Sequence, residues 1–298
     1  MPPLLPPGRL RIGVVGAGKV GAVLAAALAR TGHLVVAASA VSEASLARAA
    51  ALLPDTPIAP PDDVIGASDL ALLAVPDDVL APLVEGLATT GVWRPGQLAL
   101  HTSGRCGLAP LAPAIALGVG GMAIHPAMSF TGTEMDLQRL RDCCFGITAP
   151  PELIPVAQAL VVEMGGEPVP VDEFDRVRYH LGLVHGSNYL ITLTAQAMEI
   201  LRRAGVEDPG RVLRPLMSAA LDNALRAGDA ALTGPVARGD AGTVAEHLHA
   251  LRDEEPDVQD AYTTLAEATL ARARRQGRLG AVAAEALAAV LADQEDPT

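Results

Sequence analysis

The positions of hydrophobic and polar residues alternate between two patterns from residue 10 to about residue 171. Short apolar runs are typical of buried strands, and the longer Ala/Leu-rich stretches between them are typical of helices. Strands are predicted at residues 10–15, 34–39, 70–75, 97–101, 121–125, 144–148 and 168–171, and helices at residues 20–30, 43–53, 77–87, 108–117 and 152–164. Strands separated by helices of this length form right-handed βαβ units, so the pattern predicts an α/β fold with a doubly wound parallel sheet.

The pattern changes after Asp172, where the strand-like runs stop. One long helix is predicted over residues 174–204, and further helices are predicted at residues 208–227, 240–252, 257–276 and 280–293. We therefore expect two domains: an α/β domain over residues 1–172 and an all-α C-terminal domain over residues 173–298.

Composition narrows the class of protein. The net charge is −12, and the 22 cationic side chains include a single lysine, Lys19. The cations form no cluster along the chain, and a nucleic-acid binder needs such a cluster. The three cysteines, Cys106, Cys143 and Cys144, form no CxxC pair and are expected to be reduced thiols, and no metal site is expected. The N-terminus lacks the pattern of a signal peptide, and no apolar run is long enough for a membrane span. A cytoplasmic protein is expected.

A glycine-rich segment follows the first predicted strand. Gly16, Gly18 and Gly21 match G-x-G-x-x-G between a strand and a helix, which is the context of a dinucleotide-binding loop. The first glycine permits the tight turn, the second lets the backbone approach the pyrophosphate, and the third lets helix and strand pack closely. With Lys19 and Val20, which lie in the same loop, these glycines are the expected cofactor-binding residues; the alternative is a glycine-rich turn without a ligand.

The second strand bears on the choice of cofactor. An acidic residue usually follows this strand in NAD-binding domains, but here Ser39 stands at about that position. The absent carboxylate removes repulsion of a 2′-phosphate, and Ser39 and Ser42 could donate hydrogen bonds to it. The sequence therefore favours NADPH over NADH, although no arginine lies immediately beside these serines. Ser42 is also a plausible N-cap of the next helix.

Ligands of open α/β sheets bind beyond the carboxyl ends of the strands, and three such ends carry suggestive residues. Val75 and Pro76 can pack against a nicotinamide. The next two ends carry polar side chains, namely His101, Thr102, Ser103 and His125. Two histidines with neighbouring hydroxyls could bind a carbonyl or carboxylate and relay a proton, with His125 and Ser103 as catalytic candidates and His101 and Thr102 as substrate ligands. Alternatively, both histidines cap strand ends through backbone hydrogen bonds.

The predicted long helix carries polar residues within an apolar segment. At about 100° per residue, His180, Ser187, Asn188 and Thr194 lie on one side of it. Buried polar groups need partners, so this stripe is either part of a site, with His180 and Asn188 as catalytic candidates, or an interhelical hydrogen-bonded seam. Gly186, four residues after Gly182, would allow another backbone or the cofactor to approach.

Four motifs carry a resemblance to known proteins: H-T-S-G at 101–104, I-H-P-A-M-S-F at 124–130, Y-H-x(7)-N at 179–188 and L-T-G-P-V-A-R-G-D at 232–240. The chain resembles the superfamily of 6-phosphogluconate dehydrogenases, β-hydroxyacid dehydrogenases, ketopantoate reductases and pyrroline-5-carboxylate reductases. Within it, the motifs are similar to the Rossmann-like oxidoreductases with a C-terminal domain of unknown function, some of which are regarded as ketopantoate reductases. The resemblance implies a Rossmann domain followed by a helical domain that contributes to the substrate pocket and to a homodimer.

One departure from these relatives affects the chemistry. Several of them carry a lysine on the long helix one turn before an asparagine, but here Val184 stands one turn before Asn188. The proton donor must then be a histidine (His125 or His180), a hydroxyl group or water.

In the last motif, Thr233 and Arg238 could bind a substrate carboxylate. The alternative is that Asp240 caps a helix and Arg238 forms a surface ion pair. We expect an NADPH-dependent reductase of a small carbonyl compound, with a 2-oxo acid such as ketopantoate as the leading substrate. A cyclic-imine reductase and a non-catalytic NADP-binding sensor are the alternatives.

Overall fold

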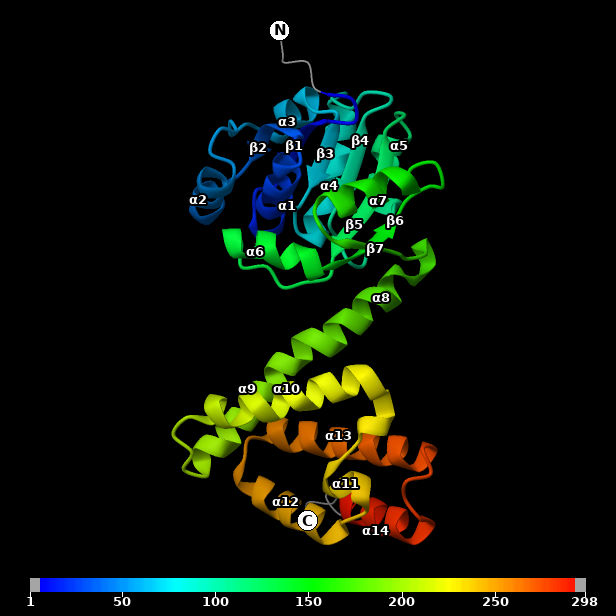
Figure 1. Ribbon diagram of the computed structural model, residues 1–298. Coiled ribbons are helices and arrows are strands. Elements are labelled where there is room, and N and C mark those ends of the chain that lie inside the picture. The colour runs from blue at the N-terminus through cyan, green and yellow to red at the C-terminus, as the bar shows by residue number, and fades with distance from the viewer. Residues whose placement is uncertain (1–5, 293–298) are drawn as a thin grey trace. The chain divides into compact units, whose positions relative to one another are not determined.

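The computed structural model describes residues 6–292 and divides into two compact units, one ending at Ser187 and the other beginning at Asn188 (Figure 1). The N-terminal residues 1–5, on which part of the signal-peptide argument rests, and residue 293 of the last predicted helix lie outside the described residues. In the part that is described, no helix is both long and apolar enough to cross a membrane. The three cysteines form no disulfide.

The first unit is built on one seven-stranded sheet in the order β2-β1-β3-β4-β5-β6-β7. Its strands are β1 (Arg11–Val15), β2 (Leu34–Ser39), β3 (Leu70–Leu73), β4 (Leu98–His101), β5 (Gly120–Pro126), β6 (Cys144–Thr148) and β7 (Glu167–Pro170). The order reverses between β2 and β3, which both flank β1, as in a doubly wound sheet. The predicted fold class is confirmed.

The expectation of an entirely parallel sheet is wrong at one pair, because β5 and β6 are antiparallel. A parallel crossover usually needs a helix long enough to return along the sheet. The connection from β5 to β6 contains only the six-residue helix α6 (Glu134–Arg139) and a 3₁₀ turn (Leu140–Asp142), so β6 starts at the edge where β5 ended.

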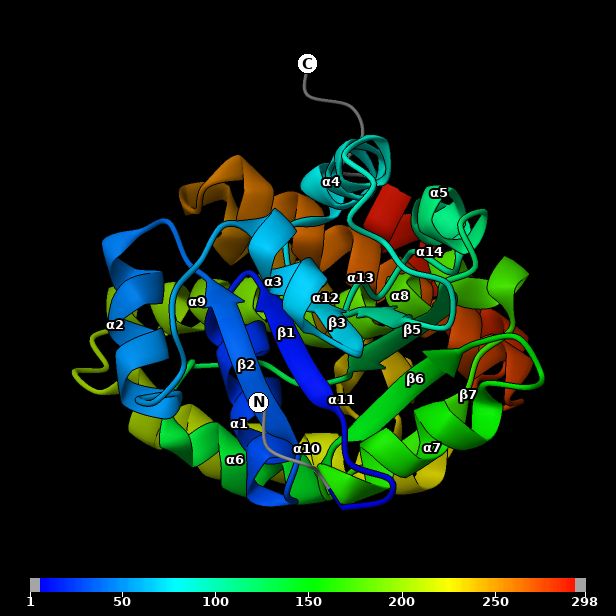
Figure 2. The same cartoon turned by 90° about the horizontal axis from the view of Figure 1, so that it is seen from above.

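Helices cover both faces of the sheet (Figure 2). One face packs on α1 (Lys19–Arg30), α2 (Glu43–Leu52), α6 and α7 (Ile154–Glu163). The other face packs on α3 (Pro61–Ala67), α4 (Asp77–Thr89) and α5 (Ala112–Ile115). Within β3, Leu70 and Leu72 belong to the first core and Ala71 and Leu73 to the second, as the two-residue period of a strand requires.

The short helices were the weakest part of the prediction. Helices α3 and α6 were not predicted, and the helix expected at residues 108–117 is a 3₁₀ turn (Ala109–Leu111) followed by the four-residue α5. Pro110 and Pro113 explain the shortening, since each lacks the N–H that a regular helix would use.

The long predicted helix is not regular. It consists of a 3₁₀ turn (Glu173–Asp175), α8 (Arg176–Leu183), a π-helical segment (Val184–Asn188) and α9 (Tyr189–Arg203). The wider π turn changes the angle per residue, so the polar stripe calculated for a regular α-helix does not continue through residues 184–188. Helix α8 belongs to the first compact unit, whereas the sequence placed the boundary near residue 172, where the strands stop.

The second unit is helical throughout its described part, residues 188–292. After α9 it contains α10 (Pro209–Ala227), α11 (Gly234–Arg238), α12 (Ala241–Ala250), α13 (Pro256–Arg275) and α14 (Ala281–Ala292). Its core forms where α12, α13 and α14 pack together around Val244, Leu270 and Leu287. The all-α prediction is confirmed, with α11 as an unpredicted short helix.

Candidate functional site

The glycine loop between β1 and α1 fits tightly at two of its three glycines. Gly16 has φ +93°, and a Cβ there would lie 2.6 Å from the carbonyl oxygen of Ala74 at the end of β3. A Cβ on Gly21 would lie 2.2 Å from the carbonyl oxygen of Gly16. Any side chain at either position would push the loop away from β3 or from its own helix.

Gly18 is different, because no heavy atom lies within 4 Å of the position its Cβ would take. It is the N-cap of α1, and no side chain caps this helix. The first backbone N–H groups of a helix lack intrahelical partners, and together with the helix dipole they favour an anion. An open backbone at the start of an uncapped helix fits a dinucleotide diphosphate. Lys19 is exposed here and Val20 is half-buried.

The two serines near the end of β2 are both engaged with the protein. Ser39 is buried, and its hydroxyl accepts a hydrogen bond of 3.0 Å from the N–H of Gly16. Ser42 accepts from the N–H of Ser45 at 3.2 Å, which confirms the N-cap of α2. Ser39 therefore holds the glycine loop in place, and Ser42 starts the helix that follows β2.

Val75 and Pro76 lie beside the same loop, as the sequence predicted for the end of β3. Val75 is half-buried, and a Cβ on Gly16 would lie 3.2 Å from its Cγ1 atom. Pro76 is the N-cap of α4 and is exposed. Both residues thus remain accessible next to the loop that fits a diphosphate.

His101 caps the end of β4 through backbone hydrogen bonds, which is the structural alternative that the sequence left open. Its Nε2 lies 2.7 Å from the carbonyl oxygen of Gly107, and its Nδ1 accepts from the N–H of Ser103 at 3.2 Å. These contacts assign the proton to Nε2. Burial, more than any other factor, lowers its pKa to about 4. His101 is fully buried and neutral, and it holds the loop after β4 in place. Thr102, in the same loop, is half-buried.

Arg176, at the start of α8, anchors this loop from the other side. It is 1% exposed and donates to three backbone carbonyls: that of Cys106 at 3.0 Å, that of Ser103 at 2.6 Å and that of Gly146 at 3.1 Å. Ser103 is itself buried, and its hydroxyl accepts from the N–H of Cys106. One guanidinium thereby ties α8 to the β4 loop and to β6, and it leaves a buried positive charge beside the ring of Tyr179.

His125, near the end of β5, meets α8 rather than the backbone. Its Nδ1 lies 3.1 Å from the hydroxyl of Tyr179, and its ring centroid lies 6.2 Å from that of His180 in an edge-on arrangement. A Cβ on Gly104 would lie 2.6 Å from His180 Cδ2 and 3.0 Å from His125 Nε2. Gly104 thus makes room for both rings, and the first unit brings together three titratable side chains from β5 and α8.

The electrostatics of this cluster follow from burial. Burial first, and then the charges of Arg176 and His180, lower the pKa of His125 to about 4. Burial raises the pKa of Tyr179, although the nearby Arg176 opposes this shift. At neutral pH the cluster therefore holds an uncharged imidazole and a protonated phenol. The guanidinium carbon of Arg176 lies 5.6 Å from the centre of the Tyr179 ring.

Three of the predicted site residues lie in the second unit. Asn188 is exposed and ends the π-helical segment. Thr233 is exposed and is the N-cap of α11, and Arg238, also exposed, lies in the last turn of that helix. Asp240 accepts from the N–H of Thr243 at 3.1 Å, so it caps α12, as the alternative reading of this motif proposed. The substrate-binding role of Thr233 and Arg238 stays a prediction.

Sequence reasoning missed Tyr179 and Arg176 as site residues. Tyr179 stands inside the Y-H-x(7)-N motif, and its position beside His180 was the available signal. Arg176 gave no such signal, because nothing in the sequence distinguishes a buried arginine from the many exposed ones.

Two family models each match a part of the chain. Residues 3–126 match the Rossmann-like domain, and residues 143–269 match the domain of unknown function DUF2520. The chain therefore combines a Rossmann-like domain with a DUF2520 domain, as the motifs predicted. The second match includes Arg176, Tyr179 and most of the helical unit. No curated protein matches the chain.

Several solved structures share the fold. A protein from Bacteroides fragilis, provisionally assigned as an NADP oxidoreductase, is 23% identical with a TM-score of 0.71, over 88% of this chain and 98% of the other. An imine reductase from Myxococcus stipitatus in complex with NADP⁺ is 18% identical with a TM-score of 0.65, over 87% and 94%. An imine reductase from Pseudomonas sp. is 17% identical with a TM-score of 0.65, over 95% and 99%. At these identities the likeness establishes the fold.

Proposed function

We propose that this protein is an NADPH-dependent reductase that transfers hydride to a small carbonyl compound, with a 2-oxo acid such as ketopantoate as the leading candidate. The observation that carries the proposal is the pairing, within one unit, of a diphosphate-type glycine loop with a half-buried His125–Tyr179–His180 cluster near neighbouring strand ends. The names of the structural neighbours include NADP and NADP⁺ but also NAD⁺, so they support a nicotinamide cofactor, and the choice of NADPH rests on the absent carboxylate after β2.

The residues of the loop would hold the cofactor through its phosphates. Gly16, Gly18 and Gly21, with the uncapped start of α1 and the adjacent Lys19 and Val20, would bind the diphosphate, while Val75 and Pro76 would contact the nicotinamide half. A bound reduced nicotinamide would supply the hydride.

Because the long helix carries no lysine, another group must donate the proton that the product alkoxide takes up. The hydrogen-bonded pair Tyr179–His125 is the best candidate. His125 is neutral at pH 7, so it cannot give up an imidazolium proton there, whereas Tyr179 keeps its phenolic proton. We place the proton that neutralises the product alkoxide on this hydrogen-bonded pair. The negative charge left on the pair would be stabilised by Arg176, and solvent would restore the proton.

The charge at the cluster favours a carbonyl over an imine. Reduction of a carbonyl develops negative charge on oxygen, whereas an imine is reduced most readily as a cation. Arg176 is a buried cation beside Tyr179, and the two carboxylates whose charges act on this cluster both accept hydrogen bonds from other groups. Asp77 accepts from Arg105 at 2.8 Å, and Glu173 accepts from the N–H of Leu108. The imine alternative is kept because four of the structural neighbours are named imine reductases.

An NADPH-oxidation assay against a panel of 2-oxo acids and cyclic imines tests the proposal. Turnover of a 2-oxo acid at a higher kcat/KM than any imine is the expected result. The reverse order would establish the imine alternative. Thermal stabilisation by NADP⁺ without turnover of any compound would overturn the proposed catalytic function and favour a non-catalytic NADP-binding sensor.

We also propose that two copies of the chain associate as a homodimer through the helical unit and the π-helical segment that leads into it. Apolar side chains on α9 and α10 are largely exposed, among them Ile191 (71%), Leu216 (65%) and Leu225 (79%). No heavy atom lies within 4 Å of the Cβ position of Gly186, so a second backbone has room to approach. A Gly186→Leu change should weaken the dimer in light scattering coupled to size-exclusion chromatography, and unchanged assembly would argue against this interface.

A further inference from the structure

Two cationic side chains that are distant in sequence converge on Gly132. Arg48 comes from α2 and Lys19 from the first turn of α1. A Cβ on Gly132 would lie 2.7 Å from Arg48 Nε and 3.0 Å from Lys19 Cγ, which places those two atoms within about 6 Å of each other. Gly132 has φ +80°, so its backbone conformation and its missing side chain both make room for the side chains of Arg48 and Lys19.

The loop that carries Gly132 is held in place from within. The fully buried carboxylate of Asp136 accepts from the N–H of Thr131 at 2.8 Å and from the N–H of Gly132 at 2.7 Å. The hydroxyl of Thr131 also donates to it at 3.0 Å. Because these bonds use the carboxylate of Asp136, it serves to hold the loop rigid where Lys19 and Arg48 meet.

Neither cation is neutralised by the protein. Across residues 6–292, neither Lys19 nor Arg48 forms a hydrogen bond or an ion pair. The other carboxylate on this side, Glu134, pairs with Arg30 at 2.6 Å. Both side chains therefore keep their charges free for an anionic ligand beside Gly132.

The position narrows the identity of that anion. Lys19 directly follows Gly18, which lies at the open start of α1, and Arg48 lies on the helix that Ser42 caps after β2. In a dinucleotide-binding domain the adenosine ribose is held at the end of the second strand, next to the diphosphate. Ser39 rather than an acidic residue ends that strand, and the first carboxylate after it is Glu43 in the first turn of α2.

We infer that Arg48 and Lys19 form the binding site for the 2′-phosphate of NADP(H). The inference rests on the proposed function, since it names the residues that select the cofactor of that site. Arg48 supplies the forked donors that match a phosphate, and Lys19 supplies a second charge from the side of the diphosphate. Ser39, being buried against Gly16, acts by positioning the loop.

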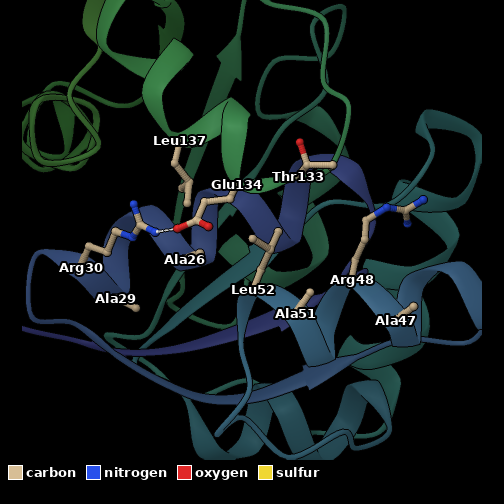
Figure 3. A pocket seen from close by; sticks show the side chains of 11 residues that line it. Ala26, Ala29, Arg30, Ala47, Arg48, Ala51, Leu52, Thr133, Glu134 and Leu137 are labelled. Atoms are coloured by element: carbon tan, nitrogen blue, oxygen red, sulfur yellow. Dashed lines mark hydrogen bonds and ion pairs between the residues drawn. The ribbon is translucent and has the colours of Figure 1, made fainter.

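The same groove supplies a matched control. Figure 3 shows Arg48 at the opposite end of the α1–α2–α6 groove from Arg30, whose guanidinium pairs with Glu134. Arg30 is thus an arginine of the same surface that already has a carboxylate partner. Removing it changes the net charge by the same amount without removing an unneutralised cation.

The test measures dissociation constants of NADP⁺, NAD⁺, 2′,5′-ADP and ADP by calorimetry for the wild-type chain, Arg48→Ala, Arg48→Glu and Arg30→Ala. We expect Arg48→Ala to weaken NADP⁺ and 2′,5′-ADP about tenfold or more, Arg48→Glu to weaken them further, and NAD⁺ and ADP to change less than about twofold. Arg30→Ala should change none of them by more than about twofold. Melting curves of the variants establish that each is folded.

The outcomes separate the inference from the proposed function. If the wild-type chain binds neither dinucleotide, the proposed function fails. If it binds both and Arg48→Ala weakens NADP⁺ and NAD⁺ equally, Arg48 contacts the shared diphosphate and the inference is overturned. A wild-type chain that prefers NAD⁺ would overturn the inference as well.

Discussion

His125 Nδ1 and the hydroxyl oxygen of Tyr179 lie 3.1 Å apart, although 54 residues separate them in the chain. The contact joins the end of β5 to α8, and it gives a chain without a helix lysine a protonated hydroxyl beside a neutral imidazole. Because Arg176 fastens α8 to the loop after β4 and to β6, the two side chains are held in register by the fold rather than by their own bond alone.

Tyr179→Phe should lower kcat by about 10² to 10³, because it removes the phenolic proton of the proposed donor pair but keeps the ring. Binding of NADP⁺ should remain within about twofold, since Tyr179 is not part of the glycine loop. Steady-state kinetics and calorimetry measure the two effects. A variant with wild-type kcat would remove Tyr179 from the chemistry.

The buried histidines predict how stability depends on pH. Burial lowers the pKa of His101 to about 4, whereas an unfolded histidine titrates near 6.5. Between those pH values the unfolded chain binds more protons, so the free energy of unfolding falls as the pH is lowered. One such histidine should account for a loss on the order of 2 kcal/mol between pH 7.5 and pH 5.

Denaturant unfolding of the wild-type chain and His101→Gln at the two pH values tests this account. His125 contributes with the same sign, because its pKa is also lowered to about 4, so His101→Gln should flatten the dependence only in part. Equal pH dependence in both chains would mean that His101 does not titrate as its burial implies.

The glycine loop predicts opposite behaviour for two alanine variants. Gly18→Ala should fold normally, since its Cβ position is open, but should weaken both dinucleotides about tenfold or more by blocking the approach of the diphosphate. Gly21→Ala should destabilise the unit by about 1–3 kcal/mol, because its Cβ would lie 2.2 Å from the carbonyl oxygen of Gly16. Melting temperatures and titrations of both variants decide the matter, and a destabilised Gly18→Ala with unchanged affinity would contradict it.

Arg176→Met should destabilise the first unit by at least about 3 kcal/mol, because three buried carbonyls would lose their donor. Arg178→Met is the matched control: its side chain is 84% exposed, and the change should stay within about 0.5 kcal/mol. Denaturant unfolding compares the two. A small effect of Arg176→Met would show that water or other donors replace the guanidinium.

The elements with strong periodicity could be predicted from the sequence, and those with weak periodicity could not. The strands, the glycine loop and the helical second half follow local patterns, and so does the Ser42 N-cap. The reversal of β6 and the π-helical turn depend on how segments pack, which no local pattern records.

The candidate site divides in the same way. The sequence placed His101 and His125 at strand ends, but it could not show that His101 is structural and His125 is the catalytic candidate. The difference lies in their hydrogen-bond partners, the backbone of Gly107 and the side chain of Tyr179. Nor could the sequence predict that the side chains of Arg48 and Lys19 lie near each other. Their proximity depends on the backbone conformation of Gly132, more than 80 residues further along the chain.

The one lysine of the chain has a practical consequence. An amine-directed reagent has a single side chain to modify in the whole sequence, and the exposed Lys19 stands beside the proposed diphosphate loop. Because nucleotide bound at that loop should cover the Lys19 amine, coupling at Lys19 should slow as nucleotide is added, and the dependence of its rate on nucleotide concentration would yield an affinity without any turnover.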